Sequence, residues 1–130
     1  MTSTRGRLPQ RLAAPDPGWT VEADVVVVGS GAGGGVGGAT ARLLAQLGAR
    51  LAITDVNAAA LEATAKVTGA VPLLGDLRQV STCTEIINRA TAALGKLDGL
   101  VNAAGIWVEG ASELAREEDW AACIDVNLKA

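Results

Sequence analysis

Short apolar runs rich in β-branched residues alternate with longer amphipathic stretches along most of the chain. Runs of this length and composition are typical of strands that are buried on both faces of a sheet. Four such runs are present, at residues 24–28, 50–54, 71–74 and 99–102. We therefore predict four strands, each of which leads into a loop and then a helix.

The stretches between these runs carry apolar residues at three- and four-residue spacing, which predicts helices. The first helix begins near Val36 and ends at Gly48, and Asn57 caps the second. The third helix ends at Gly95, and Ser112 is expected to cap the last one. The third helix is expected to present one apolar face, made of Val80, Cys83, Ile87, Ala90 and Leu94.

Strands that alternate with helices favour parallel pairing through right-handed crossovers. We predict an α/β fold, a doubly wound parallel sheet of about four strand–helix units that occupies residues 21–130. The carboxyl ends of its strands meet at one edge, where such sheets bind ligands. Residues 1–20 carry arginines and no acid before Asp16. They are predicted to form a disordered tail, with a transit peptide as the alternative.

Composition and charge exclude several classes of function. The 130 residues include 11 Lys and Arg against 14 Asp and Glu, a formal net charge of -3, which leaves no basic footprint for nucleic acid. Hydrophobic residues make up 49% of the chain, too many for a disordered protein, yet no apolar run is long enough for a membrane span. The absence of His excludes a His-based triad or a His-ligated metal, and the absence of Tyr excludes a phenolic general acid.

The chain has two cysteines, Cys83 and Cys123, which are too few for a four-thiolate zinc site. We predict no metal site. Both cysteines are interpreted as free thiols in a reducing compartment, because no secretory signal precedes them. We therefore expect a cytoplasmic location.

A glycine-rich stretch joins the first predicted strand to the first helix. At such a junction, glycines permit a tight turn and let backbone N–H groups approach a pyrophosphate at the positive end of the helix. Two registers of a dinucleotide motif coexist: residues 29–34 match G-x-G-x-x-G, and residues 31–37 match G-x-x-x-G-x-G. The glycines alone do not decide between the two registers, and a Gly-rich linker is the structural alternative.

A carboxylate, Asp55, follows the second predicted strand. At this position it can accept hydrogen bonds from the 2′-hydroxyl of an adenosine ribose, and it would repel a 2′-phosphate. Val56 comes next, so no Arg or Lys follows directly to bind a phosphate. These residues favour NAD over NADP. Asp55 can also cap the next helix, and the two roles are compatible.

An amide side chain, Asn127, is predicted to share a helix face with Trp120 and Ile124, because the three residues lie at positions i, i+4 and i+7. The face is otherwise apolar. An unpaired buried amide costs about 1–3 kcal/mol, so Asn127 is expected to have hydrogen-bond partners. The structural alternative is that Asn127 only satisfies backbone groups at a helix bend.

The order of these features resembles the short-chain dehydrogenase/reductase family, whose turn reads T-G-x-x-x-G-x-G. Ser30 stands where the family usually has Thr, and Gly29 replaces the apolar residue that normally ends the strand. Residues 102–105 match the N-A-A-G of the family, and residues 125–129 repeat its V-N-L context. The resemblance covers residues 25–130 and implies a Rossmann-type NAD(P)-binding domain.

The resemblance also implies roles for single residues. Asp76 would accept a hydrogen bond from the adenine amino group, although it could instead be a loop residue that caps the following helix. Small residues after Asn102 would let the backbone approach the cofactor ribose, and the Asn102 amide would tie neighbouring strands together. Asn127 would hold a water of the proton relay. The expected cofactor-binding residues are Ser30, Gly31, Gly35, Val36, Gly37, Asp55, Val56, Asp76, Leu77, Asn102, Ala103, Ala104 and Gly105.

Members of the family transfer a hydride between nicotinamide and a carbonyl or alcohol, using a Ser, a Tyr and a Lys that lie beyond the V-N-L segment as Ser and Y-x-x-x-K. This chain has no Tyr, Lys129 belongs to the V-N-L-K context, and Ser112 lies too early. We therefore interpret the chain as the N-terminal, cofactor-binding portion of such an enzyme, truncated before the catalytic segment and inactive alone. The expected partners are a dinucleotide and, in a full-length homo-oligomer, a small alcohol or carbonyl substrate.

Two other hypotheses stay open. The first is a non-catalytic module that binds adenine nucleotides. The second is the FAD-binding start of a flavin oxidoreductase, because residues 29–34 after a D-V-V-V-V strand look like its turn, although N-A-A-G at residues 102–105 argues against it. The sequence does not name a substrate. An unpaired edge on the fourth strand leads us to expect that the isolated chain is marginally stable or insoluble.

Overall fold

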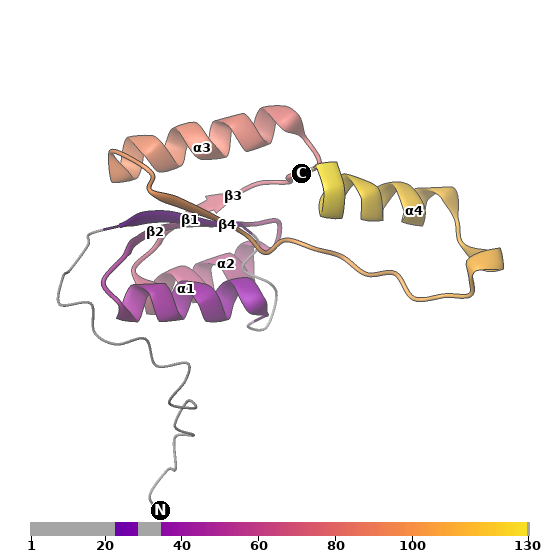
Figure 1. The fold of residues 1–130 in the computed structure, drawn as a ribbon, viewed down its shortest axis with the longest axis horizontal. Coiled ribbons are helices and arrows are strands. Elements are labelled where there is room, and N and C mark those ends of the chain that lie inside the picture. Colours follow the sequence, from indigo (N-terminus) through magenta and orange to yellow (C-terminus); the bar gives the residue numbers. More distant parts are fainter. Residues whose placement is uncertain (1–22, 29–34, 130) are drawn as a thin grey trace, which may run out of the picture.

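A parallel sheet of four strands forms the centre of the structure, a computed structural model that describes residues 23–28 and 35–129. The spatial order is β3-β2-β1-β4. Two helices, α1 (Val36–Gln46) and α2 (Ala58–Thr68), lie on one side of the sheet, and α3 (Val80–Leu94) lies on the other (Figure 1). The strands are β1 (Asp24–Val28), β2 (Arg50–Asp55), β3 (Val71–Leu74) and β4 (Gly99–Asn102). The predicted doubly wound α/β fold is confirmed.

The strand register aligns the carboxyl ends of the strands. Val28 lies opposite Thr54 on one side and opposite Asn102 on the other, and Asp55 lies opposite Leu74. The loops that follow β2, β3 and β4 therefore leave the sheet at the same edge, as expected for parallel strands joined by helices.

The predicted helix boundaries around α1, α2 and α3 are largely confirmed. Asn57 caps α2, because its Oδ1 accepts a hydrogen bond of 3.0 Å from the Ala60 N–H. Gly48 follows α1 with a φ of 88°, and Gly95 follows α3 with a φ of 91°. Both glycines adopt backbone conformations that other residues rarely take, which explains why the helices end there.

Two small hydrophobic clusters hold the layers together. On the side of α1 and α2, the sheet packs Leu51 and Ile53 against Ala41, Leu61 and Ala65. On the side of α3, the cluster consists of Ala52, Leu73, Ile86, Ala90 and Leu94.

The predicted apolar face of the third helix was partly wrong. Val80 is 80% exposed and Ile87 is 39% exposed, whereas Ile86 is buried. Ile86, Ala90 and Leu94 are spaced four residues apart, so they form one stripe toward the sheet, and Ile87 lies beside that stripe.

The last helix, α4 (Glu117–Ile124), begins later than predicted. Ser112 starts a short 3-10 turn, η2 (Ser112–Leu114), and no side chain caps α4 at Arg116, so the predicted Ser112 cap was wrong. The extended backbone of Ala115 interrupts the helical path between them. A π-helical turn, η3 (Asp125–Lys129), continues α4. Figure 1 shows α4 to one side of the sheet, at the end of a long connection from β4.

Several predictions lie outside the described residues or at the periphery of the sheet. The predicted disordered tail of residues 1–20 and the turn residues Ser30 and Gly31 lie outside the described ranges.

Within these ranges, β4 pairs only with β1, and Leu100 on β4 is 55% exposed. No described helix has the length and apolar character needed to cross a membrane. No described group of three or more acidic or cysteine side chains is arranged to hold a metal ion.

Candidate functional site

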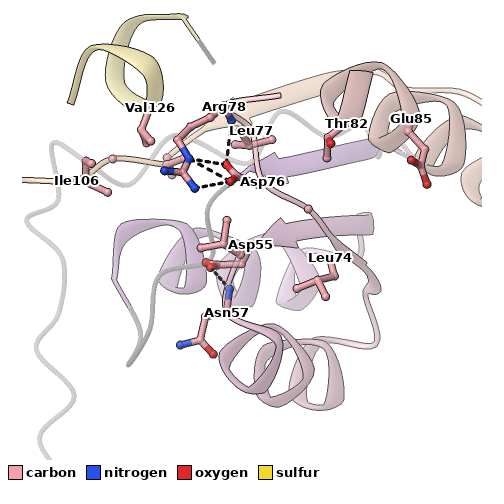
Figure 2. A pocket seen from close by; sticks show the side chains of 15 residues that line it. Asp55, Asn57, Leu74, Asp76, Leu77, Arg78, Thr82, Glu85, Ile106 and Val126 are labelled. Carbon is pink, nitrogen blue, oxygen red and sulfur yellow. Dashed lines mark hydrogen bonds and ion pairs between the residues drawn. The ribbon is translucent and has the colours of Figure 1, made fainter. Parts of the chain in front are cut away.

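A cleft of about 910 Å³ opens at the carboxyl ends of β2, β3 and β4 (Figure 2). Its walls are the segments that follow these strands, residues 55–57, 74–78 and 103–106. Thr82 and Glu85 of α3 and Val126 of η3 complete the described lining. The structure thus brings together seven of the predicted cofactor-binding residues: Asp55, Val56, Asp76, Leu77, Ala103, Ala104 and Gly105.

Asp55 is the last residue of β2 and points into this region of the cleft (Figure 2). Its Oδ1 accepts a hydrogen bond of 2.8 Å from the backbone N–H of Asn57. The predicted capping role is therefore present, since Asp55 orders the short loop whose next residue caps α2. Further lone pairs of such a carboxylate can accept a hydrogen bond from a ribose hydroxyl. This role of Asp55 stays a prediction.

Asp76 lies in the loop between β3 and α3 and forms an ion pair with Arg78. Oδ1 of Asp76 accepts hydrogen bonds of 3.0 Å from the backbone N–H and the Nε of Arg78. Oδ2 accepts from Nε at 3.0 Å and from Nη2 at 2.5 Å. These hydrogen bonds from Arg78 hold the pKa of the Asp76 carboxyl below its usual range. The carboxylate therefore stays ionised at neutral pH.

Arg78 is a cleft residue that sequence reasoning missed. It is the only cation among the described residues that line the cleft, and its side chain is half exposed. Arg78 precedes α3, which begins at Val80. The available signal was the D-x-R spacing, because a turn folds the arginine back onto the aspartate two residues earlier.

The N-A-A-G segment ends β4 and forms one wall of the cleft. Ala103, Ala104 and Gly105 line it, and Asn102 does not. No hydrogen bond joins the Asn102 side chain to another described residue, so its proposed role in tying strands stays a prediction. A Cβ on Gly105 would lie 3.4 Å from Oδ1 of Asn127, so Gly105 lies beside the Asn127 side chain.

Asn127 connects the π-helical turn to this wall. Its Oδ1 accepts a hydrogen bond of 2.9 Å from the Ile106 N–H, and its Nδ2 donates one of 2.9 Å to the Ile106 carbonyl. The expected partners are therefore present, but the residue is exposed and the expected shared face is altered by the change from α to π geometry. The contacts fit the alternative in which Asn127 satisfies backbone groups at a bend. They also fit a functional role, because π-helical turns are frequent at functional sites.

Three further predicted residues, Gly35, Val36 and Gly37, lie at the start of α1. Gly35 precedes the helix and provides no capping side chain, and Val36 is exposed in the first turn. Gly37 is buried. The aligned peptide dipoles of α1 place a positive partial charge at this end of the helix, which is the end that binds anions in other proteins.

Comparison with known proteins decides the family. Residues 24–130 match the family model described as short chain dehydrogenase. The chain belongs to the short-chain dehydrogenase/reductase family. This result confirms the resemblance based on the glycine turn and on residues 102–105, and it does not favour the flavin hypothesis or the non-catalytic module. Members of this family use NAD or NADP, and the family is one of oxidoreductases.

Two curated relatives illustrate the similarity. The chain is 40% identical over 89 residues to cis-1,2-dihydrobenzene-1,2-diol dehydrogenase of Pseudomonas putida, an alignment that covers 67% of this chain and 32% of the relative. It is 34% identical over 105 residues to a 3-oxoacyl-[acyl-carrier-protein] reductase of Thermotoga maritima, covering 77% of this chain and 43% of the relative. The chain therefore spans less than half the length of these relatives.

A solved structure agrees with the fold. A short chain dehydrogenase from Mycobacterium smegmatis superposes with a TM-score of 0.79 at 25% identity, and the match covers 85% of this chain and 48% of that one. The four-stranded sheet and its helices in this family member therefore follow the Rossmann-like arrangement of the family.

Proposed function

We propose that this chain forms the adenosine-binding part of an oxidoreductase that transfers a hydride between a nicotinamide dinucleotide and an alcohol or carbonyl. The observation that carries the proposal is the cleft at the carboxyl ends of β2, β3 and β4, which gathers the predicted binding residues. When bound, the nicotinamide supplies the hydride chemistry. The residues of this chain bind and orient the dinucleotide at its adenosine end.

The lining of the cleft fits an adenosine. Its volume, about 910 Å³, is ample for a purine and a ribose, and binding pockets for small molecules span roughly 300–1,000 Å³. Asp55 presents a carboxylate for ribose hydroxyls, and Asp76 presents one for the amino group of adenine. The small side chains of Ala103, Ala104 and Gly105 leave the backbone open to a ligand.

Charge in the cleft favours NAD over NADP. Its described lining contains the carboxylates of Asp55, Asp76 and Glu85. Arg78 is already engaged by Asp76, which weakens its attraction for a further anion. A 2′-phosphate would thus meet a wall of net negative charge, whereas a ribose hydroxyl would gain hydrogen bonds.

Asn127 is proposed to hold the backbone beside the reaction site rather than to react itself. Its two hydrogen bonds to Ile106 fix the end of the N-A-A-G segment against the π-helical turn.

We propose that turnover requires a general acid that the 130 residues do not contain, since they include no Tyr. Proton transfer by a positioned acid typically contributes 10²–10⁴-fold to the rate. The names of the two relatives, a diol dehydrogenase and a 3-oxoacyl reductase, support an alcohol or carbonyl as the substrate.

Isothermal titration calorimetry on the 130-residue chain tests the proposal. We expect NAD to bind more tightly than NADP, and we expect Asp55→Asn to narrow that preference by about tenfold, because it removes the repelling charge. Glu109→Gln is the matched control, since Glu109 is an exposed acid that does not line the cleft, and it should leave the preference unchanged. The absence of dinucleotide binding, or an equal affinity of the unsubstituted chain for NAD and NADP, would contradict the proposal.

A further inference from the structure

The ion pair of Asp76 and Arg78 differs from an ordinary surface pair in its geometry. Three N–H groups of one residue hold a single carboxylate: the backbone N–H, Nε and Nη2 of Arg78. Because Nε contacts both oxygens at 3.0 Å, the guanidinium and the carboxylate face each other edge to edge. This arrangement fixes the plane of the Asp76 carboxylate, which a single hydrogen bond would not do.

The carboxylate of Asp76 retains an acceptor site. An ionised carboxylate offers about four lone-pair directions. Arg78 reaches them with only three N–H groups, because its single Nε hydrogen is shared between Oδ1 and Oδ2 at 3.0 Å each, so a ligand donor can replace one half of that shared contact. The Asp76 side chain lines the cleft and keeps 34% of its surface exposed. A donor on a molecule in the cleft can therefore reach an oxygen whose orientation Arg78 has already set.

The charge of a second carboxylate also acts on Arg78. The hydrogen bonds from Asp76 raise the pKa of Arg78 most, and the charge of Asp125 on η3 raises it further. Figure 2 shows the guanidinium of Arg78 beside Asp76, on the side of Ile106 and Val126.

We propose that Arg78 is a positioning residue for the recognition of the purine: it holds the Asp76 carboxylate so that the remaining acceptor site receives the 6-amino group of adenine. This inference rests on the proposed dinucleotide binding. The inference predicts an effect that depends on which purine is bound. Arg78 contributes to affinity only for a purine that donates a hydrogen at position 6, and it contributes nothing when that position bears an oxygen acceptor, as in hypoxanthine.

The test compares NAD with nicotinamide hypoxanthine dinucleotide by calorimetry on the 130-residue chain. We expect the unsubstituted chain to prefer NAD, and we expect Arg78→Gln to weaken NAD binding about tenfold, which corresponds to roughly 1.4 kcal/mol. The hypoxanthine dinucleotide should bind Arg78→Gln and the unsubstituted chain within about twofold. Arg78→Lys should restore part of the NAD affinity, because an ammonium keeps the charge but not the planar fork.

Two further variants distinguish positioning from a structural role. Arg116→Gln removes an equivalent Arg–Asp fork, in which Nε and Nη2 of Arg116 lie 2.8 and 3.0 Å from the Asp119 carboxylate outside the cleft, and it should change neither affinity. Asp76→Asn should reproduce the loss seen with Arg78→Gln. The double substitution at Asp76 and Arg78 should add nothing further, since both residues act through one hydrogen bond.

The possible failures point to different conclusions. If the unsubstituted chain binds no dinucleotide, the proposed function fails and this inference fails with it. If the chain binds NAD and the hypoxanthine dinucleotide equally, or if Arg78→Gln weakens both by the same factor, only the role of Arg78 is refuted. Tighter NAD binding by Arg78→Gln would likewise refute it, because Arg78 would then compete with adenine for Asp76. Urea midpoints of the variants verify that each has folded.

Discussion

The hydroxyl of Thr54 is fully buried near the carboxyl end of β2 and has no hydrogen-bond partner among the described residues. Thr54 lies between Val28 and Leu73 in the strand register, on the strand that ends at Asp55. A buried hydroxyl that has lost its water without gaining a partner destabilises the folded state. Replacing Thr54 by Val exchanges the hydroxyl for a methyl group of similar size, so the shape of the core is preserved.

The expected gain follows from the cost of burying an unpaired hydroxyl, which protein substitutions place at about 1–3 kcal/mol. Val also has a high propensity for strands. We therefore expect Thr54→Val to raise the free energy of unfolding by about 1 kcal/mol or more. For a domain of 130 residues, 1 kcal/mol corresponds to an increase in Tm of roughly 4 °C.

Thr68→Val is the matched control for this substitution. The Thr68 hydroxyl donates to the Thr64 carbonyl at 2.8 Å and accepts from the Ala70 N–H at 3.3 Å, so the same chemical change removes real hydrogen bonds. We expect it to lower stability by about 1 kcal/mol.

Urea unfolding followed by far-ultraviolet circular dichroism measures both variants, with the m-value checked for constancy. A loss of stability in Thr54→Val, or the same sign of change in both variants, would refute the reasoning from the unpaired hydroxyl.

Three other predictions concern the cleft and its supports. Asn127→Ala should lower stability by roughly 1–2 kcal/mol and speed hydrogen exchange at the Ile106 amide, because both hydrogen bonds to Ile106 are lost; unchanged exchange would contradict this. Asn57→Ala should lower the free energy of unfolding in urea by about 1 kcal/mol, and Asn57→Asp should lower it much less, since an aspartate still caps α2. Hydrogen bonds from Arg78 and Lys96 hold the pKa values of Asp76 and Asp98 below the usual range. These carboxylates should stabilise the fold fully above about pH 4 and lose that contribution as the pH falls toward their native pKa values, so the urea midpoint should drop in this window.

The strands and most helix ends could be predicted from the sequence because each depends on a local rule. β-branched runs mark buried strands, Gly48 and Gly95 stop helices through their backbone conformations, and Asn57 caps α2. These signals lie within a few residues of the feature that they predict. Tertiary packing does not override these local signals.

The errors arose where the deciding contact is not local. Ile86 and Ile87 are both apolar, and only the position of the sheet determines that Ile86 is the buried one. Ser112 is a good capping residue, but an extended segment at Ala115 separates it from α4. Arg78 was missed because its role depends on a turn that brings its guanidinium back to Asp76.

Acidic residues at the amino and carboxyl ends of the strands cannot be told apart in the sequence. In the structure they differ in the groups that bind their carboxylates. Asp24 begins β1 and is buried; it forms an ion pair with Arg50 Nε at 2.7 Å and accepts a hydrogen bond from Arg50 Nη2 at 2.9 Å. Arg50 is its register partner on β2, so this pair joins two strands and closes the amino end of the sheet. At the carboxyl end, Asp55 accepts a hydrogen bond from the Asn57 N–H and Asp76 accepts from Arg78, and both carboxylates line the cleft. Ion-paired carboxylates therefore serve two purposes in this sheet: Asp24 joins two strands at the amino end, whereas Asp76 lines the cleft at the carboxyl end.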